Sequence, residues 1–120
     1  MILVDTSIWI DHLRSVDSRL VDLLDHGQVL AHPFVIGELA CGNLQNRDGI
    51  LRLLGDLPQS PVASPEEALH FIGHNQLMGR GIGYIDIHLL AATALARDAL
   101  LWTADKRLKK VAGGLKLTIN

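Results

Sequence analysis

The first nine residues, MILVDTSIW, decide the fold, because a short apolar run here ends at an acid followed by two hydroxyl residues. Residues 1–4 are typical of a short buried strand. Thr6 or Ser7 is suited to cap a helix over residues 8–13, since hydroxyl side chains accept hydrogen bonds from the first free backbone amides of a helix. The stretch therefore predicts a strand followed at once by a helix, with Asp5 at the end of the strand.

The same order of strand and helix recurs along the rest of the chain. Further strands are predicted at residues 28–31, 100–103 and 115–119. Helices are predicted over residues 20–24, 33–40, 50–57, 65–78, 86–99 and 105–111. Strands that alternate with helices form parallel sheets covered on both faces. We therefore expect one α/β domain over residues 1–120, with three α/β/α layers around a central, mostly parallel, twisted sheet.

Composition limits the classes of protein to which the chain belongs. Hydrophobic residues make up 48% and charged residues 20% of the sequence, which excludes disorder as its main state. The formal net charge of -2 provides no overall basic field, so any nucleic-acid role must come from a local site. The single cysteine, Cys41, has no intramolecular disulfide partner, and no apolar run approaches the roughly 18 to 20 residues of a membrane span. We expect a soluble, cytoplasmic protein that does not associate with membranes.

Four acids fall near the predicted carboxyl ends of strands, namely Asp5, Glu38, Asp86 and Asp105. In a parallel α/β sheet these ends lie along one edge, where ligands bind. Two carboxylates about 5 Å apart repel by roughly 3 kcal/mol at an effective dielectric constant near 20, so a cluster of four needs a cation. Ligands that are all oxygen suit Mg²⁺ or Mn²⁺, and the chemistry that such a site supports is hydrolysis of phosphodiester bonds.

Four stretches of the chain carry a family resemblance through their order and spacing. They are residues 4–7 with Trp9, residues 33–42, residues 83–91 and residues 101–108. With these motifs the sequence resembles the PIN-domain ribonucleases, and in particular the VapC-type toxins of bacterial toxin–antitoxin pairs, over nearly its whole length. One departure is Leu108, because many relatives carry an aromatic residue at this position.

The resemblance implies a single PIN-like nuclease domain whose metal ligands and catalytic residues are Asp5, Glu38, Asp86 and Asp105. It implies that Thr103 helps to shape the site and that RNA is the substrate. It also implies a homodimer that is inhibited by a small VapB-type antitoxin, whose tail lies over the active groove.

Other polar residues near the acids are candidate substrate contacts. Thr6, Ser7 and Thr103 adjoin the predicted strand ends, while Arg80 and Lys106 are near Asp86 and Asp105 in sequence and are candidates for phosphate binding. The rest of the basic cluster around Lys106 is interpreted as a solvated helix face.

Some residues also have purely structural interpretations. Each acid could be a helix cap or a solvated side chain, and Trp9 and Trp102 are interpreted as core residues. His88 would either line the site entrance or lie on the surface, and Cys41 is interpreted as a small buried hydrophobe without a catalytic role. His70 and His74 are four residues apart on one helix, but no third zinc ligand is evident.

The leading hypothesis is a Mg²⁺- or Mn²⁺-dependent endoribonuclease that acts as the toxin of a type II toxin–antitoxin pair. One alternative is a nuclease of the same architecture that cuts DNA. A second is a phosphoacceptor receiver domain, although such a domain normally has two adjacent acids after its first strand, where this chain has Asp5 followed by Thr6 and Ser7. A third is a binding module that retains the acids without catalysis.

Overall fold

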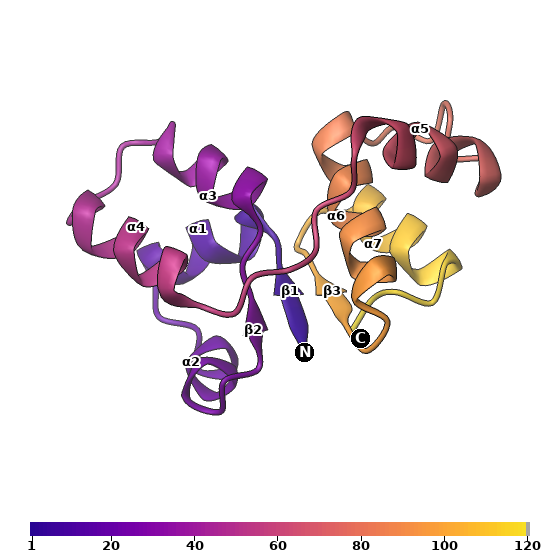
Figure 1. Cartoon of the computed structure of the whole chain (residues 1–120). Helices are drawn as coiled ribbons and strands as arrows, with labels where there is room; N and C mark the ends of the chain where they lie inside the picture. Colours follow the sequence, from indigo (N-terminus) through magenta and orange to yellow (C-terminus); the bar gives the residue numbers. More distant parts are fainter. Residues whose placement is uncertain (120) are drawn as a thin grey trace.

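The computed structural model describes residues 1–119, and within them it contains three strands and seven helices (Figure 1). In chain order the elements are β1 (Ile2–Val4), α1 (Thr6–Arg14), α2 (Ser18–Asp25), β2 (Val29–Leu30), α3 (Pro33–Ala40), α4 (Arg47–Asp56), α5 (Pro65–His74), α6 (Tyr84–Ala96), β3 (Leu100–Trp102) and α7 (Lys106–Gly114). The alternation of short strands with helices that the sequence predicts is confirmed.

The sheet is parallel, and its strands follow the order β2-β1-β3. Ile2 of β1 is in register with Val29 of β2 on one side and with Leu100 of β3 on the other. Because β1 is central, both of its neighbours end at the same edge of the sheet as β1 itself. All segments that follow a strand therefore begin at one edge of the molecule.

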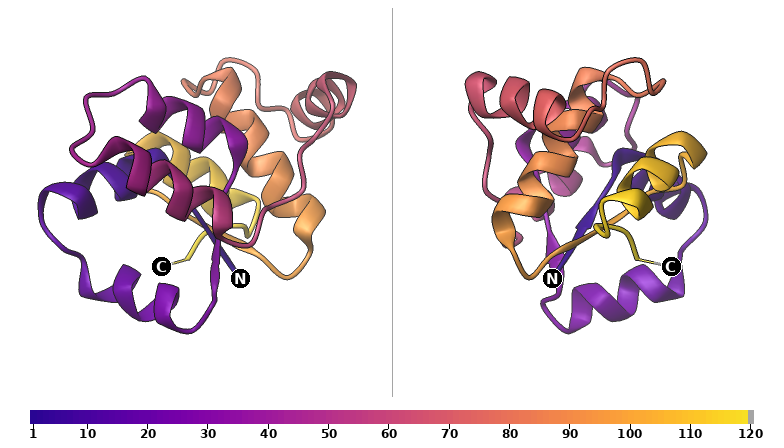
Figure 2. Two further views of the ribbon diagram at one scale, coloured as in Figure 1. Left: turned by 60° about the vertical axis from the view of Figure 1, so that its left-hand side comes forward. Right: turned by 90° about the vertical axis from the view of Figure 1, so that its right-hand side faces the viewer.

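Helices lie on both sides of the sheet. In Figure 1, α1 to α4 lie on one side of the three strands and α5 to α7 lie on the other. The right-hand view of Figure 2 shows the strands passing between α6 and α7, so these two helices cover opposite faces. The expected three-layer α/β/α architecture is therefore confirmed.

The core is built from the central strand and the helix that packs against the sheet. Leu3 and Val4 of β1 are fully buried, as are Leu101 of β3 and Leu89 and Leu90 of α6. Every residue of α6 from position 87 to 93 is buried, which explains why this stretch of sequence is apolar nearly all round. Each fully buried leucine, isoleucine or valine side chain among them contributes about 1.5 to 3 kcal/mol of transfer free energy.

Both tryptophans pack as the sequence predicts, although to different degrees. Trp9 is buried in the core, whereas Trp102 is half-buried under the guanidinium carbon of Arg19, which lies 5.1 Å from the ring centroid. A cation over an aromatic face is attracted by the ring quadrupole. The contact fastens α2 to the end of β3.

The start of α5 agrees with the sequence, whereas its end does not. Ser64 Oγ accepts a hydrogen bond from the Glu67 amide at 3.1 Å, and the Glu67 carboxylate accepts one from the Ser64 amide at 2.8 Å, which is the predicted start of α5. In contrast, α5 ends at His74 rather than at residue 78. The chain turns at Gln76, whose φ is 54°, and buries Leu77 against the core.

Other boundaries also differ from the prediction. The α1 helix begins at Thr6 rather than at residue 8, and α6 spans Tyr84–Ala96 rather than residues 86–99 because Arg97 adopts a φ of 66°. Residues 115–119 do not form a full strand. Thr118 makes a single parallel bridge to Leu101, so this segment only borders the sheet.

Within residues 1–119, no helix has both the length and the apolar character needed to cross a lipid bilayer.

Candidate active site

The four acids are positioned by three strand ends and three helix starts. Asp5 directly follows β1, and Glu38 is in the second turn of α3, which begins shortly after β2. Asp105 precedes α7 and follows β3 by three residues, while Asp86 is the third residue of α6. The parallel order of the strands accounts for the meeting of segments that are up to 100 residues apart.

Hydroxyl side chains hold Asp5 in place. Its Oδ2 atom accepts hydrogen bonds from Thr103 Oγ1 at 2.7 Å and from Ser7 Oγ at 2.8 Å. In return, Ser7 Oγ accepts from the Ala104 amide and Thr103 Oγ1 accepts from the Asp105 amide, each at 3.0 Å. The ends of β1 and β3 are therefore connected through the carboxylate of a buried acid.

Asp5 occupies the position before α1 but does not cap this helix through its side chain. The structural interpretation of Asp5 as a helix cap is therefore wrong. The expected cap by Thr6 or Ser7 is also wrong, because both residues are inside α1 and donate their hydroxyl hydrogens to acids. Thr6 Oγ1 donates to Glu38 Oε1 at 2.6 Å, which links the start of α1 to α3.

Asp86 and Asp105 do act as helix caps. Asp86 Oδ2 accepts from the Gly83 amide at 3.1 Å, and Asp105 Oδ1 accepts from the Leu108 amide at 3.0 Å. Each cap uses one carboxylate oxygen. The same is true of Asp5 and Glu38, so within residues 1–119 every one of the four acids has a second oxygen without a hydrogen bond.

The pKa of Asp86 shows that the four acids share one electrostatic environment. Burial raises the pKa of this half-buried carboxyl, and repulsion from Asp5, Asp105 and Glu38 raises it further, while the hydrogen bond from Gly83 opposes the shift. A charge influences another group in this way only when the two are close and poorly screened. Asp5, Glu38 and Asp105 are therefore each close enough to Asp86 for their charge to act on it.

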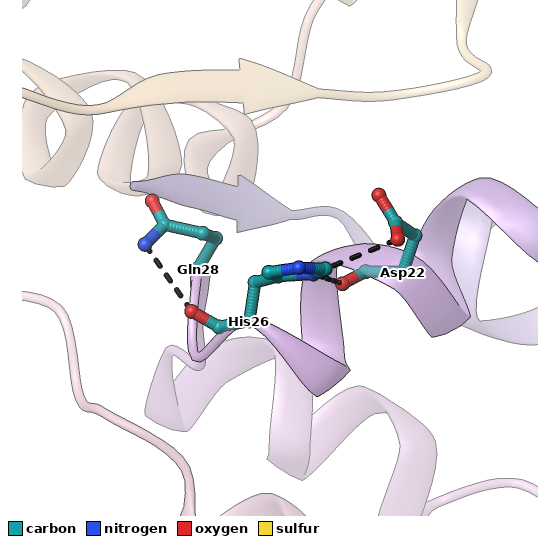
Figure 3. Close-up of polar contacts among 3 residues, drawn as sticks. All are labelled: Asp22, His26 and Gln28. Carbon is teal, nitrogen blue, oxygen red and sulfur yellow. Dashed lines mark hydrogen bonds and ion pairs between the residues drawn. The ribbon is translucent and has the colours of Figure 1, made fainter.

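None of these four acids has a basic partner in the part of the chain that the structure describes. There, the single ion pair joins Asp22 Oδ1 to His26 Nδ1 at 3.5 Å on α2 (Figure 3). In the same described part, no group of three or more His, Cys, Asp or Glu side chains is arranged to hold a metal ion. The donor chemistry of four unpaired carboxylates fits a hard divalent cation, while their present arrangement does not itself form a coordination cage.

Comparisons with known proteins place this site in a family. A model of the PIN domain matches residues 2–114. The chain belongs to the PIN-domain family. Ribonuclease VapC32 of Mycobacterium tuberculosis, from strains CDC 1551 / Oshkosh and ATCC 25618 / H37Rv, is 52% identical to it over 109 residues, which cover 91% of this chain and 88% of the relative. The resemblance to VapC-type PIN proteins is confirmed.

The hydroxyl residues of this PIN domain contact the acids directly, whereas in the described part of the chain the proposed basic residues do not. Thr6, Ser7 and Thr103 all contact one of the four acids directly. Arg80 and Lys106 are exposed, and neither forms an ion pair or a side-chain hydrogen bond within residues 1–119. Their role as phosphate contacts stays a prediction.

One basic residue that the sequence did not single out lies beside the site. The side chain of Arg107 packs over Gly81, where an added Cβ would be 3.0 Å from a guanidinium nitrogen. Gly81 also has a φ of 79°, a conformation that favours glycine. Arg107 therefore covers the loop that leads to Asp86, which only the folded chain reveals.

Two histidines of the PIN domain are buried beside the acid-bearing helices. His32 Nδ1 accepts a hydrogen bond from the Phe34 amide at 3.0 Å and so caps α3, but its Nε2 atom has no partner. Burial, with a smaller contribution from His88, lowers the pKa of His32 to about 4. His32 was not predicted from the sequence, although a histidine directly before a proline at a helix start was an available signal.

His88 is neither at the site entrance nor on the surface, so both predictions for it are wrong. It is only 3% exposed, and its ring packs against Phe34 and Tyr84 at centroid distances of 4.8 and 4.6 Å. Burial lowers its pKa. The apolar neighbours that bury it come from two helices, and the sequence of α6 alone does not specify them.

The remaining candidates have no role in the site. His70 and His74 stack on each other at 5.7 Å, and among the described residues they gain no third ligand. Cys41 is exposed, so its interpretation as a buried hydrophobe is wrong. It follows α3 at a turn where the chain leaves the core.

Proposed function

We propose that this protein is a divalent-metal-dependent endoribonuclease and the toxin of a type II toxin–antitoxin pair. The single observation that carries the proposal is the set of four carboxylates, none with a basic partner within residues 1–119, whose charges act together on Asp86. Membership of the PIN-domain family and the ribonuclease name of the VapC relatives support the same activity.

In this proposal Asp5, Glu38, Asp86 and Asp105 hold Mg²⁺ or Mn²⁺ through their second oxygens. When bound, such an ion supplies activation of water and stabilisation of negative charge at phosphorus. The protein contributes no nucleophile of its own. Its acids would be the catalytic residues because they hold and orient the ion.

The hydroxyl residues act as positioning residues for these acids. Thr103 and Ser7 fix the carboxylate plane of Asp5, and Thr6 fixes that of Glu38. The Gly83 amide does the same for Asp86. Outer hydrogen bonds of this kind orient metal ligands, and their loss typically costs about 10- to 100-fold in metal affinity or activity.

Arg80 and Lys106 are proposed to bind phosphates on either side of the cleaved bond. Both side chains are exposed and precede or follow an acid of the cluster closely in sequence. Phosphate contacts position a nucleic acid without reading its sequence. Replacing either residue by glutamine should weaken RNA binding for all sequences alike.

The direct test is cleavage of labelled RNA by the purified protein with Mg²⁺, with Mn²⁺ and with EDTA. We expect cleavage only with metal, and loss of cleavage in Asp5→Asn. A DNA oligonucleotide of the same sequence in the same assay separates the RNA-directed enzyme from its DNA-directed alternative. Cleavage that persists in EDTA or in Asp5→Asn would remove the proposal.

The proposed partners follow from the VapC type of the family. They are a VapB-type antitoxin that covers the active groove and a second copy of the chain in a homodimer, all in the cytoplasm. Coexpression with the product of an adjacent short reading frame, followed by measurement of molecular mass in solution, tests both. The receiver alternative is not retained, because the chain belongs to the PIN-domain family.

A further inference from the structure

A groove of about 690 Å³ lies beside Glu38, between α1, α3 and the loop that follows α3. This volume falls within the range of about 300 to 1,000 Å³ that is usual for pockets that enclose small organic groups. Glu38 belongs both to the wall of the groove and to the acid cluster. Any strand of nucleic acid whose phosphate lies over the acids therefore has this groove next to it.

The apolar part of the wall comes from side chains that the core leaves uncovered. Ile10 and Leu13 project from α1 with 39% and 38% of their surfaces exposed, and half-buried Leu44 contributes from the loop after α3. Contact with these apolar side chains favours binding of a nucleobase, because the flat face of a base is apolar while its edge is polar.

The polar part of the wall offers hydrogen bonds that the protein itself does not use. The amides of Asn43 and Gln45 line the groove, and neither side chain has a hydrogen-bond partner within residues 1–119. Each amide carries donors and an acceptor, which match the edges of nucleobases. Arg14 also lines the groove and forms no ion pair in that part of the chain, which suits a phosphate.

We propose that this groove binds one nucleobase of the RNA adjacent to the cleaved bond, with Asn43 and Gln45 reading its edge. The inference rests on the proposed ribonuclease function and adds the determinant of its sequence preference. The apolar residues of α1 cover the face of the base, and Arg14 pairs with the neighbouring phosphate. An RNA occupant is favoured over a protein because the groove is continuous with the acids and combines free amides with a free cation.

The experiment is cleavage of a randomised RNA pool, followed by sequencing of the new ends. We expect the unaltered protein to prefer one base, or a pair of bases, at a position beside the cut. In Asn43→Ala and Gln45→Ala this preference should fall roughly tenfold, as for the loss of a base-edge contact, while total cleavage falls less. Arg14→Gln should weaken binding of all sequences and reduce the salt dependence by about one phosphate contact.

Gln28→Ala is the matched control, because Gln28 is an exposed amide before the amino end of β2, far from the carboxyl edge. It should leave the preference unchanged. All four altered side chains are on the surface, so thermal melting should show that the variants fold. A second measurement, binding of the preferred RNA to Asp5→Asn protein in EDTA, should weaken when Asn43→Ala is added.

The outcomes separate the two proposals. If the unaltered protein cuts RNA and every variant keeps its preference, the groove assignment is wrong and the ribonuclease stands. If Asn43→Ala and Gln45→Ala impair only the binding of an antitoxin and not the choice of cleavage site, the groove is a protein interface and the assignment is again wrong. If the unaltered protein cuts no RNA, both proposals fall together.

Discussion

The acids at the carboxyl edge of the sheet contrast with the acid at the end of α2. Asp22 has a histidine partner 3.5 Å away and is exposed to solvent, where an ion pair contributes little to stability (Figure 3). Asp86 has three acids around it and no basic partner in the described chain. The first arrangement stabilises a helix end, whereas the second costs folding free energy unless a cation relieves the repulsion.

The two regions also shift histidines in opposite directions. The backbone carbonyl and the carboxylate of Asp22 raise the pKa of His26, which is fully exposed. Burial lowers the pKa of His32 to about 4. His26, which is exposed beside an acid, therefore gains a proton readily. His32, which is buried, stays neutral.

The largest expected effect is on RNA cleavage, which should distinguish Asp86 in the acid cluster from Asp22 on α2. Asp86→Asn removes a charge and a metal-binding oxygen but keeps an acceptor for the Gly83 amide, so the fold should survive. We expect RNA cleavage to fall by at least roughly a hundredfold. Asp22→Asn, the matched control, should cleave as the unaltered protein does. Equal activity of the two variants in the labelled-RNA assay would contradict the proposed site.

The second largest expected effect is on the free energy of unfolding when a divalent metal is present. Because a cation relieves repulsion among the four carboxylates, Mg²⁺ or Mn²⁺ should raise the free energy of unfolding by about 2.7 kcal/mol at a hundred times its dissociation constant. Thermal and urea unfolding at increasing metal concentration measure this gain. Asp22→Asn should retain it, and Asp86→Asn should lose most of it. An unchanged melting temperature across millimolar metal would argue against a shared cation site.

The histidine contrast predicts a pH dependence of stability. The pKa of buried His32 is about 4 in the folded protein, against 6.5 for the exposed side chain of the unfolded chain. The stability that this group contributes is therefore complete above pH 6.5 and falls as the pH drops toward 4. The loss by pH 5 should be about 2 kcal/mol. Urea unfolding from pH 8 to pH 5 measures it.

His32→Asn isolates this contribution. Asparagine keeps a side-chain acceptor for the start of α3 but does not titrate. The variant should therefore lose less stability than the unaltered protein over the same pH range. His26→Asn, at the exposed pair, should not reduce the acid sensitivity, because the raised pKa of His26 favours the folded state below pH 6.5. An identical pH profile for His32→Asn and the unaltered protein would show that His32 titrates normally.

The smallest expected effect concerns the hydroxyl that joins β1 to β3. Thr103→Val keeps the volume of the buried side chain but removes the donor to Asp5 and the acceptor for the Asp105 amide. We expect a loss of about 1.5 kcal/mol in unfolding free energy and weaker metal binding. Thr103→Ser should restore both properties. A purely structural role would change stability without changing the metal concentration needed for half-maximal cleavage.

Sequence reasoning succeeded where a feature depends on the order of elements. The four acids were candidates because they follow a short apolar run, open a helix or, for Glu38, lie in the helix after a strand, and parallel strands bring such positions to one edge. The start of α5 was found because Ser64 and Glu67 form a local cap. These features depend on neighbours within a few residues, so they are visible without the fold.

Failures occurred where distant packing decides the outcome. The burial of His88 depends on Phe34, which is 54 positions earlier in the chain. Residues 115–119 alternate as a strand does, but they form only one bridge to Leu101. The local sequence pattern does not determine which side chains will pack against a residue or how fully a segment will pair with a strand.

The sequence by itself determined the α/β class, the parallel sheet and the four candidate acids, because the hydrophobic periods and the succession of strands and helices are properties of the chain. Only the tertiary structure decided which oxygens of those acids are used by Thr103, Ser7 and Thr6 and which are left free. It also decided that a groove with unused amides lies beside Glu38. Hydrogen bonds and cavities depend on distances of a few ångströms between residues far apart in sequence, and these distances are set only when the core packs.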